Sequence, residues 1–276
     1  MIKTIYSSLF AFSLLSISAS AFAANMPSCA SFAKMSEGDS QRLLTVVIDQ
    51  TTLVDENLIN KFNDVASEAI QPSTEVDVYT FSAFSQGEYF TRVFSAKVED
   101  QLSEKDRYTL PKKALKIYDR CLAQQKPAVV FQTESKIDNA MNGSRADLAK
   151  SDIMYSLSQV AKDIKQHHAS EKYLLLFSDM LENSAVTSFY YKNKVKKVDL
   201  DKELALVEKA GMFADFDGAK IYVMGAGILS EKGKQKGVYR DPNTLQALNL
   251  FWKEWFKRSN AKLIEFGMPE MRGTIQ

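Results

Sequence analysis

Residues 43–49 have the sequence LLTVVID, and residues 173–179 have the sequence YLLLFSD. Each stretch is a short apolar run that ends in an aspartate. Continuous apolar runs of this length, rich in Val, Ile and Leu, are typical of strands that are covered on both faces in a parallel sheet. The two stretches therefore predict two buried parallel strands, with Asp49 and Asp179 at their carboxyl ends.

Helical and strand patterns alternate along much of the remaining chain. The predicted helices cover residues 55–70, 151–167, 201–210 and 242–258, and the additional strands cover residues 75–84, 89–98, 221–224 and 262–266. Because Gly87 interrupts the pattern, we expect the strand at 89–98 to pair antiparallel with the preceding one at a sheet edge. Strands that alternate with helices predict a doubly wound, mostly parallel α/β sheet with helices on both faces.

Residues 99–150 have a less regular pattern. Helices are predicted over residues 111–122 and 127–141, each beginning at a proline, because proline is favoured at the first helical position. The region has too few apolar residues for a core of its own. We therefore expect a helical insertion within one domain that covers residues 41–276.

The first 23 residues have the pattern of a secretory signal peptide. Lys3 supplies a positive charge, residues 5–17 form an apolar run, and residues 21–23 read Ala-Phe-Ala, which is the small-x-small pattern of a cleavage site. The apolar run is shorter than the roughly 20 residues of a membrane span, so an uncleaved anchor helix is the less favoured alternative. We expect a periplasmic or secreted protein in which residues 24–40 form an N-terminal cap segment.

The composition is that of an ordinary globular protein. The chain has 276 residues, of which 45% are hydrophobic and 25% charged, and its formal net charge is +1. These values exclude a low-complexity disordered chain and a disulfide-dense miniprotein. The near-neutral charge argues against a nucleic-acid partner. We expect a protein partner in the cell envelope and no membrane span after signal cleavage.

The chain has two cysteines, Cys29 and Cys121. An oxidising compartment favours pairing of an even number of cysteines, so a Cys29–Cys121 disulfide is predicted. Closing so long a loop stabilises the fold by about 4–5 kcal/mol in the chain-entropy model, and by about 2–4 kcal/mol in typical measurements. The alternative is a pair of buried free thiols.

Oxygen-bearing side chains follow the ends of the two central strands. Asp49 is followed by Thr51, and the helix between the two strands begins at Ser151 and leads to the strand that ends at Asp179. Ligands of open parallel sheets bind beyond the carboxyl ends of the strands. Carboxylate and hydroxyl oxygens at such an edge suit a hard divalent cation such as Mg²⁺.

The order of these motifs resembles the von Willebrand factor A (vWA) domain family. The similarity covers roughly residues 41–266 and depends on Asp49-x-Thr51 after a strand, Ser151-Asp152-Ile153 opening a helix, and the strand that ends at Asp179. It implies a doubly wound sheet of order 3-2-1-4-5-6 with one antiparallel edge strand. It also implies a metal-ion-dependent adhesion site, where a cation accepts a carboxylate from a protein partner.

The match to the family's ligand residues is incomplete. Asp49 and Thr51 match the first two members of the family's D-x-S-x-S run, Ser151 matches its loop threonine, and Asp179 matches its second aspartate. Leu53 stands where the third member of the run should be, and leucine cannot bind a cation. The resemblance thus implies a degenerate site for Mg²⁺ or Mn²⁺, formed by Asp49, Thr51, Ser151 and Asp179.

Several alternatives remain at this site. Water or Glu182 could replace the missing ligand, and Glu182 is otherwise expected to be a solvated loop residue. Asp49 and Asp179 could be ordinary turn or cap aspartates, and Ser151 could cap the helix that follows it. The aromatic residues 189–191 could be exposed interface anchors or could be buried under their loop.

Other motifs give weaker signals. Gly225-Ala226-Gly227 follows a strand, but the third glycine of a dinucleotide fingerprint is missing. No Gly-x-Ser-x-Gly elbow is present, and the adjacent His167 and His168 have the spacing of neither a zinc site nor a catalytic triad. The leading hypothesis is an exported, non-enzymatic protein-binding module of the adhesion or scaffold type. The alternatives are a hydrolase or phosphotransferase on the same type of sheet, and a metal-free structural component.

Overall fold

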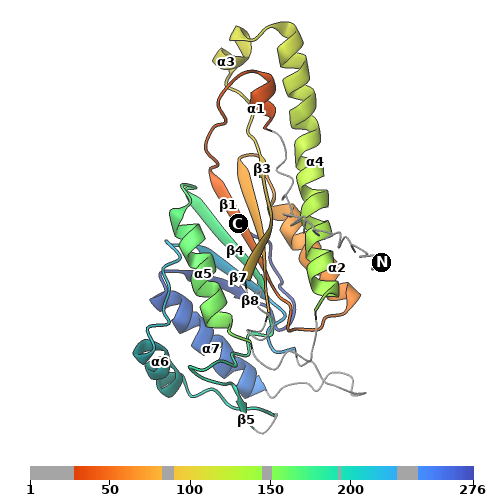
Figure 1. The fold of residues 1–276 in the computed structure, drawn as a ribbon. Coiled ribbons are helices and arrows are strands. Elements are labelled where there is room, and N and C mark those ends of the chain that lie inside the picture. The colour runs from red at the N-terminus through yellow and green to blue at the C-terminus, as the bar shows by residue number, and fades with distance from the viewer. Residues whose placement is uncertain (1–27, 83–89, 145–150, 192–193, 229–241) are drawn as a thin grey trace, which may run out of the picture.

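The computed structural model describes residues 28–82, 90–144, 151–191, 194–228 and 242–276 (Figure 1). The signal-peptide prediction for residues 1–23 and the turn predicted at Gly87 lie outside these ranges. The elements, in chain order, are α1 (Cys29–Phe32), β1 (Arg42–Asp49), α2 (Glu56–Ala69), β2 (Thr74–Phe81), β3 (Phe90–Val98), α3 (Glu104–Thr109), α4 (Lys112–Asn142), α5 (Ile153–Gln166), β4 (Glu171–Phe177), β5 (Tyr190–Tyr191), β6 (Lys194–Val195), α6 (Leu200–Lys209), β7 (Lys220–Met224), α7 (Pro242–Arg258) and β8 (Lys262–Phe266).

The main sheet confirms the predicted fold class. Its strand order is β3-β2-β1-β4-β7-β8, which is 3-2-1-4-5-6 when only the strands of this sheet are numbered. β3 pairs antiparallel with β2, and every other pairing in the sheet is parallel. The central strands β1 and β4 run side by side with Ile48 opposite Phe177, so their carboxyl ends lie at the same edge of the sheet.

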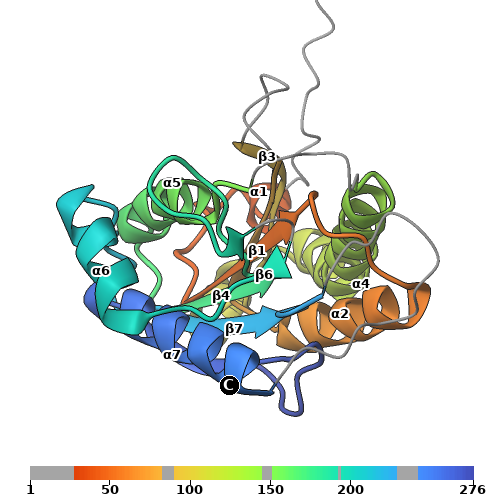
Figure 2. The same cartoon turned by 90° about the horizontal axis from the view of Figure 1, so that it is seen from below.

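Helices cover both faces of the sheet (Figure 2). Alternate residues of β1 enter two separate cores because successive side chains of a strand point to opposite faces. Leu43 and Val47 belong to the core that includes α5, α6 and α7, whereas Val46 and Ile48 belong to the core that includes α2 and α4. This two-sided burial explains why β1 is apolar almost throughout its length.

The region between β3 and α5 differs from the sequence prediction. Residues 112–142 form the single helix α4, with Pro127 inside it, instead of two helices over residues 111–122 and 127–141. A proline inside a helix removes one backbone hydrogen bond and costs about 3 kcal/mol. Packing restrains α4 on both sides of this proline: Tyr118 is buried against α1 before it, and Val129 is buried in the α2 core after it. Tertiary contacts thus offset the cost of Pro127.

A disulfide fastens the N-terminal end of α4 to α1. It joins Cys29 to Cys121, the pairing that the sequence predicts, with the two Cα atoms 5.6 Å apart. Buried Glu99 lies beneath α1, where its carboxylate accepts a 3.0 Å hydrogen bond from the Ala30 N–H and a 3.1 Å bond from the Gln125 amide. Together these contacts fix α1 against the helix and the end of β3.

Within the described ranges, no helix combines the length and the hydropathy that crossing a membrane requires.

Candidate functional site

The candidate site lies where β1 and β4 end, at the carboxyl edge of the sheet. Asp49 is the last residue of β1, and Asp179 follows β4 by two residues. Figure 2 views the molecule from this side, with β1 and β4 next to one another at the centre. Parallel pairing of the two strands therefore brings the two predicted aspartates to one edge, as the sequence implies.

The Asp49 carboxylate is the centre of a hydroxyl cluster. Its Oδ1 accepts hydrogen bonds from the Thr51 hydroxyl at 2.6 Å and from the Thr51 backbone N–H at 2.9 Å. Its Oδ2 accepts hydrogen bonds from the Ser178 hydroxyl at 2.8 Å and from the Ser151 hydroxyl at 3.3 Å. Three of the four predicted metal-site residues, Asp49, Thr51 and Ser151, are thus in direct contact.

Burial dominates the electrostatics of Asp49. The residue is completely buried, and desolvation raises the pKa of its carboxyl above the usual range, although the bonds from Thr51, Ser178 and Ser151 oppose that rise. A buried carboxylate that has donors to both oxygens is costly to disturb, because removing a donor leaves a buried acceptor unsatisfied. The cluster therefore holds the first turn after β1 in place.

Asp179 forms hydrogen bonds with Thr52, Gly227 and Leu181. Its N–H donates to the Thr52 hydroxyl at 3.3 Å, and its carbonyl oxygen accepts from the Gly227 N–H at 2.9 Å. Its Oδ1 accepts from the Leu181 N–H at 2.8 Å, as in a turn aspartate. Asp179 therefore joins the cluster through Thr52 and through the adjacent Ser178.

The chain bends sharply after Asp179. Met180 has a φ of 61°, in the left-handed region that non-glycine residues seldom adopt. Its N–H donates to the Ser178 hydroxyl at 3.0 Å, and its carbonyl accepts from the Trp252 indole N–H at 2.8 Å. The Ser178 hydroxyl thus accepts from Met180 and donates to Asp49, so one side chain connects the bend after β4 to the end of β1.

Gly225 directly follows β7 and lies at the same carboxyl edge of the sheet. Gly225 has a φ of 90°, and a Cβ at this position would lie 3.2 Å from the Phe177 ring and from the Ser178 carbonyl oxygen. The absence of a side chain at Gly225 lets β7 approach β4 closely. This close packing explains why residue 225 is a glycine, and a dinucleotide-binding motif is not needed to explain it.

Glu182 is not the solvated loop residue that the sequence suggests. It is almost fully buried, and its Oε2 accepts a 3.0 Å hydrogen bond from the Met154 N–H in the first turn of α5. Burial raises the pKa of Glu182 to about 8. Asp152, instead of Ser151, occupies the N-cap position of α5, and its side chain makes no capping hydrogen bond. Glu182, from a different loop, therefore accepts the hydrogen bond of a backbone N–H at the start of this helix.

A further expectation concerns the aromatic residues 189–191, in the segment after Glu182. Phe189 is completely buried and packs edge-on against Phe251 and Trp252, so it is a core residue and not an exposed interface anchor. In the basic run at residues 192–197, Lys196 forms a 2.9 Å ion pair with buried Glu203 on α6. These contacts fasten the loop to α6 and α7.

The donor set fits a hard cation in part. The Thr51 and Ser151 hydroxyls each donate one hydrogen to Asp49, and a hydroxyl that donates retains lone pairs that can bind a metal ion. Leu53 is partly exposed and supplies no side-chain oxygen at the third position. Among the described residues, no group of three or more His, Cys, Asp or Glu side chains could hold a metal ion. A cation here would therefore rely on hydroxyls and water, which Mg²⁺ accepts.

Sequence reasoning missed Ser178 and Thr52. Both are small polar residues beside predicted ligands, and both are completely buried. The signal for Ser178 lies in the strand register: because Ile48 is opposite Phe177, Ser178, which follows β4 directly, comes next to Asp49, the last residue of β1. That register cannot be read from either strand alone.

Taken together, these features define a doubly wound α/β protein with a carboxylate–hydroxyl cluster at the carboxyl edge of its sheet. No protein-family model matches the chain. No curated protein sequence matches it either.

The solved structures that are similar to the chain include the following two. An aerotolerance-related membrane protein from Bacteroides fragilis is 11% identical and has a TM-score of 0.39, and the match covers 82% of this chain and 92% of that chain. The pilus adhesin SpaC from Lactobacillus rhamnosus GG, in its open conformation, is 10% identical and has a TM-score of 0.35, and the match covers 83% of this chain and 29% of that chain. The fold class is established by the strand order and register of the sheet, not by these similarities.

Proposed function

We propose that the chain is an exported vWA-like module that binds a protein partner at the carboxyl edge of its sheet, with Mg²⁺ or Mn²⁺ as the bound cation. The observation that supports this most directly is the contact of Thr51 and Ser151 with the Asp49 carboxylate at the end of β1. The Thr51 and Ser151 hydroxyls would hold the cation, with Asp49 orienting them. When bound, the cation would supply a coordination position for a carboxylate of the partner.

The metal half of the proposal is tested by titrating the purified protein with MgCl₂ and with MnCl₂ in a calorimeter. We expect saturable heat for the wild type and none for the double variant T51V/S151A, which lacks both hydroxyl ligands but keeps Asp49. The matched control is Ser158→Ala, which removes an exposed hydroxyl from α5. Absence of heat for the wild type, or equal heat in T51V/S151A, would rule out this cation site.

The protein-binding half is tested by affinity capture from an envelope extract with and without EDTA. A partner that is released by EDTA and lost in T51V/S151A supports cation-dependent binding at this edge. Capture that survives both EDTA and the double substitution would favour the metal-free structural component instead.

An enzymatic role has less support. A hydrolase needs a nucleophile and a base within hydrogen-bond reach of each other. The Ser178 hydroxyl contacts the Asp49 carboxylate, but both residues are completely buried, so no substrate reaches this pair in the structure. His167 contacts Glu75 at 3.0 Å near the start of β2, at the opposite edge of the sheet. We expect no turnover of generic ester or phosphate substrates, and turnover that is lost in Ser178→Ala would overturn the non-enzymatic assignment.

A further inference from the structure

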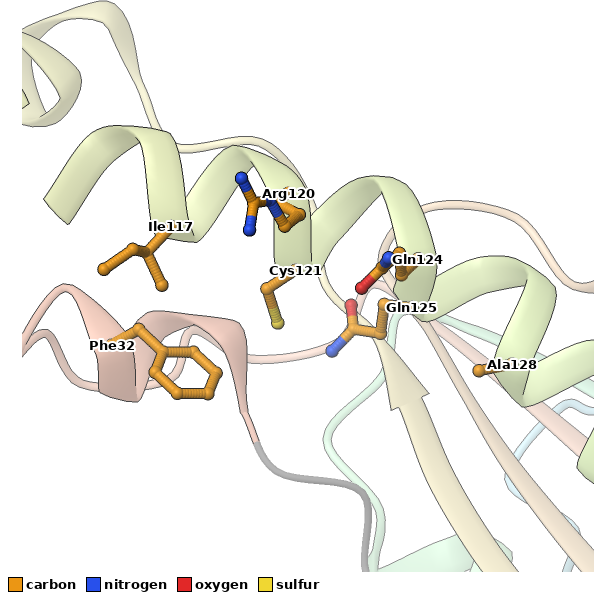
Figure 3. A pocket seen from close by; sticks show the side chains of 7 residues that line it. All are labelled: Phe32, Ile117, Arg120, Cys121, Gln124, Gln125 and Ala128. Carbon is orange, nitrogen blue, oxygen red and sulfur yellow. The ribbon is translucent and has the colours of Figure 1, made fainter. Parts of the chain in front are cut away.

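A groove lies between α1 and α4, at the opposite end of the molecule from the carboxyl edge of the sheet (Figures 1 and 3). Its volume is about 330 Å³, at the lower end of the range for ligand pockets. Figure 3 shows Phe32 on α1 facing Ile117 on α4 across the groove. The residues that line it are Phe32, Ile117, Arg120, Cys121, Gln124, Gln125 and Ala128.

Large apolar side chains are exposed in and beside this groove. Phe32 is 48% exposed, Ile117 is 44% exposed and Phe131 is 66% exposed. Ile117, Gln124 and Phe131 follow one another at seven-residue intervals along α4, and Ala128 falls between the last two. Residues with this spacing lie along one side of a helix, which is the geometry that helices use to pack lengthwise against each other. The groove thus continues along α4 as an apolar surface from Ile117 to Phe131, interrupted by the amide of Gln124. We call this surface the seam.

Two basic side chains flank the seam at the end where the groove lies. Arg120 lines the groove, and Lys113 lies seven residues before it on the same side of α4. Within the described residues neither of these cations has an ion-pair partner, whereas the neighbouring Arg107 pairs with Asp119 at 2.7 Å. Charges beside the apolar seam of a helix pair select their partners by opposite charge. The unpaired cations therefore favour an acidic ligand.

We propose that this groove binds an acidic amphipathic helix of a partner protein. The partner's apolar residues pack between Phe32 and Ile117 and along the seam to Phe131, and its flanking carboxylates meet Arg120 and Lys113. Apolar anchors at helical spacing in a groove are a common mode of peptide recognition. The concave wall that α1 adds suits a helix better than the flat surface of a membrane. This site is separate from the carboxyl edge and does not depend on the function proposed there.

The probe is a synthetic helical peptide of about three heptads, with leucine at its core positions and glutamate at its flanking positions. Its twin carries lysine in place of glutamate. Binding to the oxidised full-length mature chain is measured by fluorescence anisotropy. The test variants are Arg120→Glu and Ile117→Ser, and their matched controls on α7 are Lys253→Glu and Leu250→Ser, the latter at a side chain that is 49% exposed.

We expect the acidic peptide to bind the wild type and the lysine twin to bind at least tenfold more weakly. Arg120→Glu should weaken binding of the acidic peptide at least tenfold and improve binding of the lysine twin, and Ile117→Ser should weaken both. The α7 controls should bind as the wild type does. Failure of the acidic peptide to bind, or equal loss in the α7 controls, would overturn the proposal.

Binding of this surface to a membrane is the remaining alternative, and it is tested by sedimentation with vesicles of anionic phospholipid. Vesicle binding that is lost in Arg120→Glu, in a chain that does not bind the acidic peptide, would assign the surface to a membrane and overturn the proposal. T51V/S151A should bind the peptide as the wild type does, so this site and the carboxyl-edge site can fail separately.

Discussion

The Ser178 hydroxyl at the end of β4 donates a 2.8 Å hydrogen bond to the Asp49 carboxylate at the end of β1. The same oxygen accepts the N–H of Met180 at 3.0 Å. Because both groups are buried, the hydroxyl joins two strand ends that are distant in sequence. Much of the geometry at the carboxyl edge of the sheet depends on this one side chain.

Ser178→Ala should therefore destabilise the protein. The substitution removes a donor from buried Asp49 and an acceptor from the Met180 N–H, and each unsatisfied buried group costs about 1–3 kcal/mol. Urea unfolding followed by circular dichroism measures the change. Ser158→Ala, on the exposed side of α5, should lie within about 0.5 kcal/mol of the wild type. Equal stability of the two variants would contradict the role given to Ser178.

The stability of the protein should fall as Glu182 loses its proton. Burial raises the pKa of this carboxyl from 4.5 to about 8 in the folded state, so the folded protein holds a proton that the unfolded chain releases near pH 4.5. The contribution of this proton to the free energy of unfolding is complete below that pH. It is lost as the pH rises towards 8, at about 1.4 kcal/mol per pH unit. The free energy of unfolding, measured by urea unfolding between pH 5 and 8, should therefore depend less on pH for Glu182→Gln than for the wild type. Parallel pH profiles of the two proteins would count against this titration.

Gly225 and Gly211 provide a matched pair of substitutions. Both have positive φ, 90° and 65°, but a Cβ at Gly225 meets Phe177 and the Ser178 carbonyl at 3.2 Å, whereas a Cβ at Gly211 meets no atom within 4 Å. Gly211→Ala should cost about 1 kcal/mol for the backbone alone, and Gly225→Ala about 1–3 kcal/mol more for the added contact. Thermal unfolding in a calorimeter measures both. A Gly211→Ala variant as unstable as Gly225→Ala would show that the contact is unimportant.

Reduction of the disulfide should weaken the fold without removing it. Cys29 and Cys121 are 92 residues apart in sequence, and loss of a native disulfide typically costs about 2–5 kcal/mol. Urea unfolding with and without a reductant measures this cost. The variant C29A/C121A should match the reduced wild type and should not respond to the reductant. A transition unchanged by reduction would contradict the prediction.

The parts of the fold that could be predicted from the sequence are those whose pattern is local. The apolar runs before Asp49 and Asp179 indicated buried parallel strands, and parallel pairing then placed both aspartates at one edge. Their position together follows from topology, which the alternation of helices and strands already constrains. The strand order 3-2-1-4-5-6 came from the family resemblance and not from the pattern.

What could not be predicted depends on tertiary contacts. Pro127 alone predicts a helix start, whereas packing on either side of it, at Tyr118 and at Val129, restrains α4 as one helix. Glu182 reads as a loop carboxylate, because the α5 N–H group that it binds belongs to an earlier segment of the chain. Phe189 reads as a loop aromatic until Phe251 and Trp252 are placed around it.

The length of α4 has a mechanical consequence. At 1.5 Å per residue its 31 residues extend about 46 Å, whereas the eight residues of β1 extend about 26 Å. The helix therefore overhangs the sheet, and the overhang has a small core of its own, formed by Cys29, Ala33 and Tyr118. Because this core is small, the Cys29–Cys121 disulfide and the hydrogen bonds to Glu99 carry much of the attachment of α1 to the overhanging end of α4.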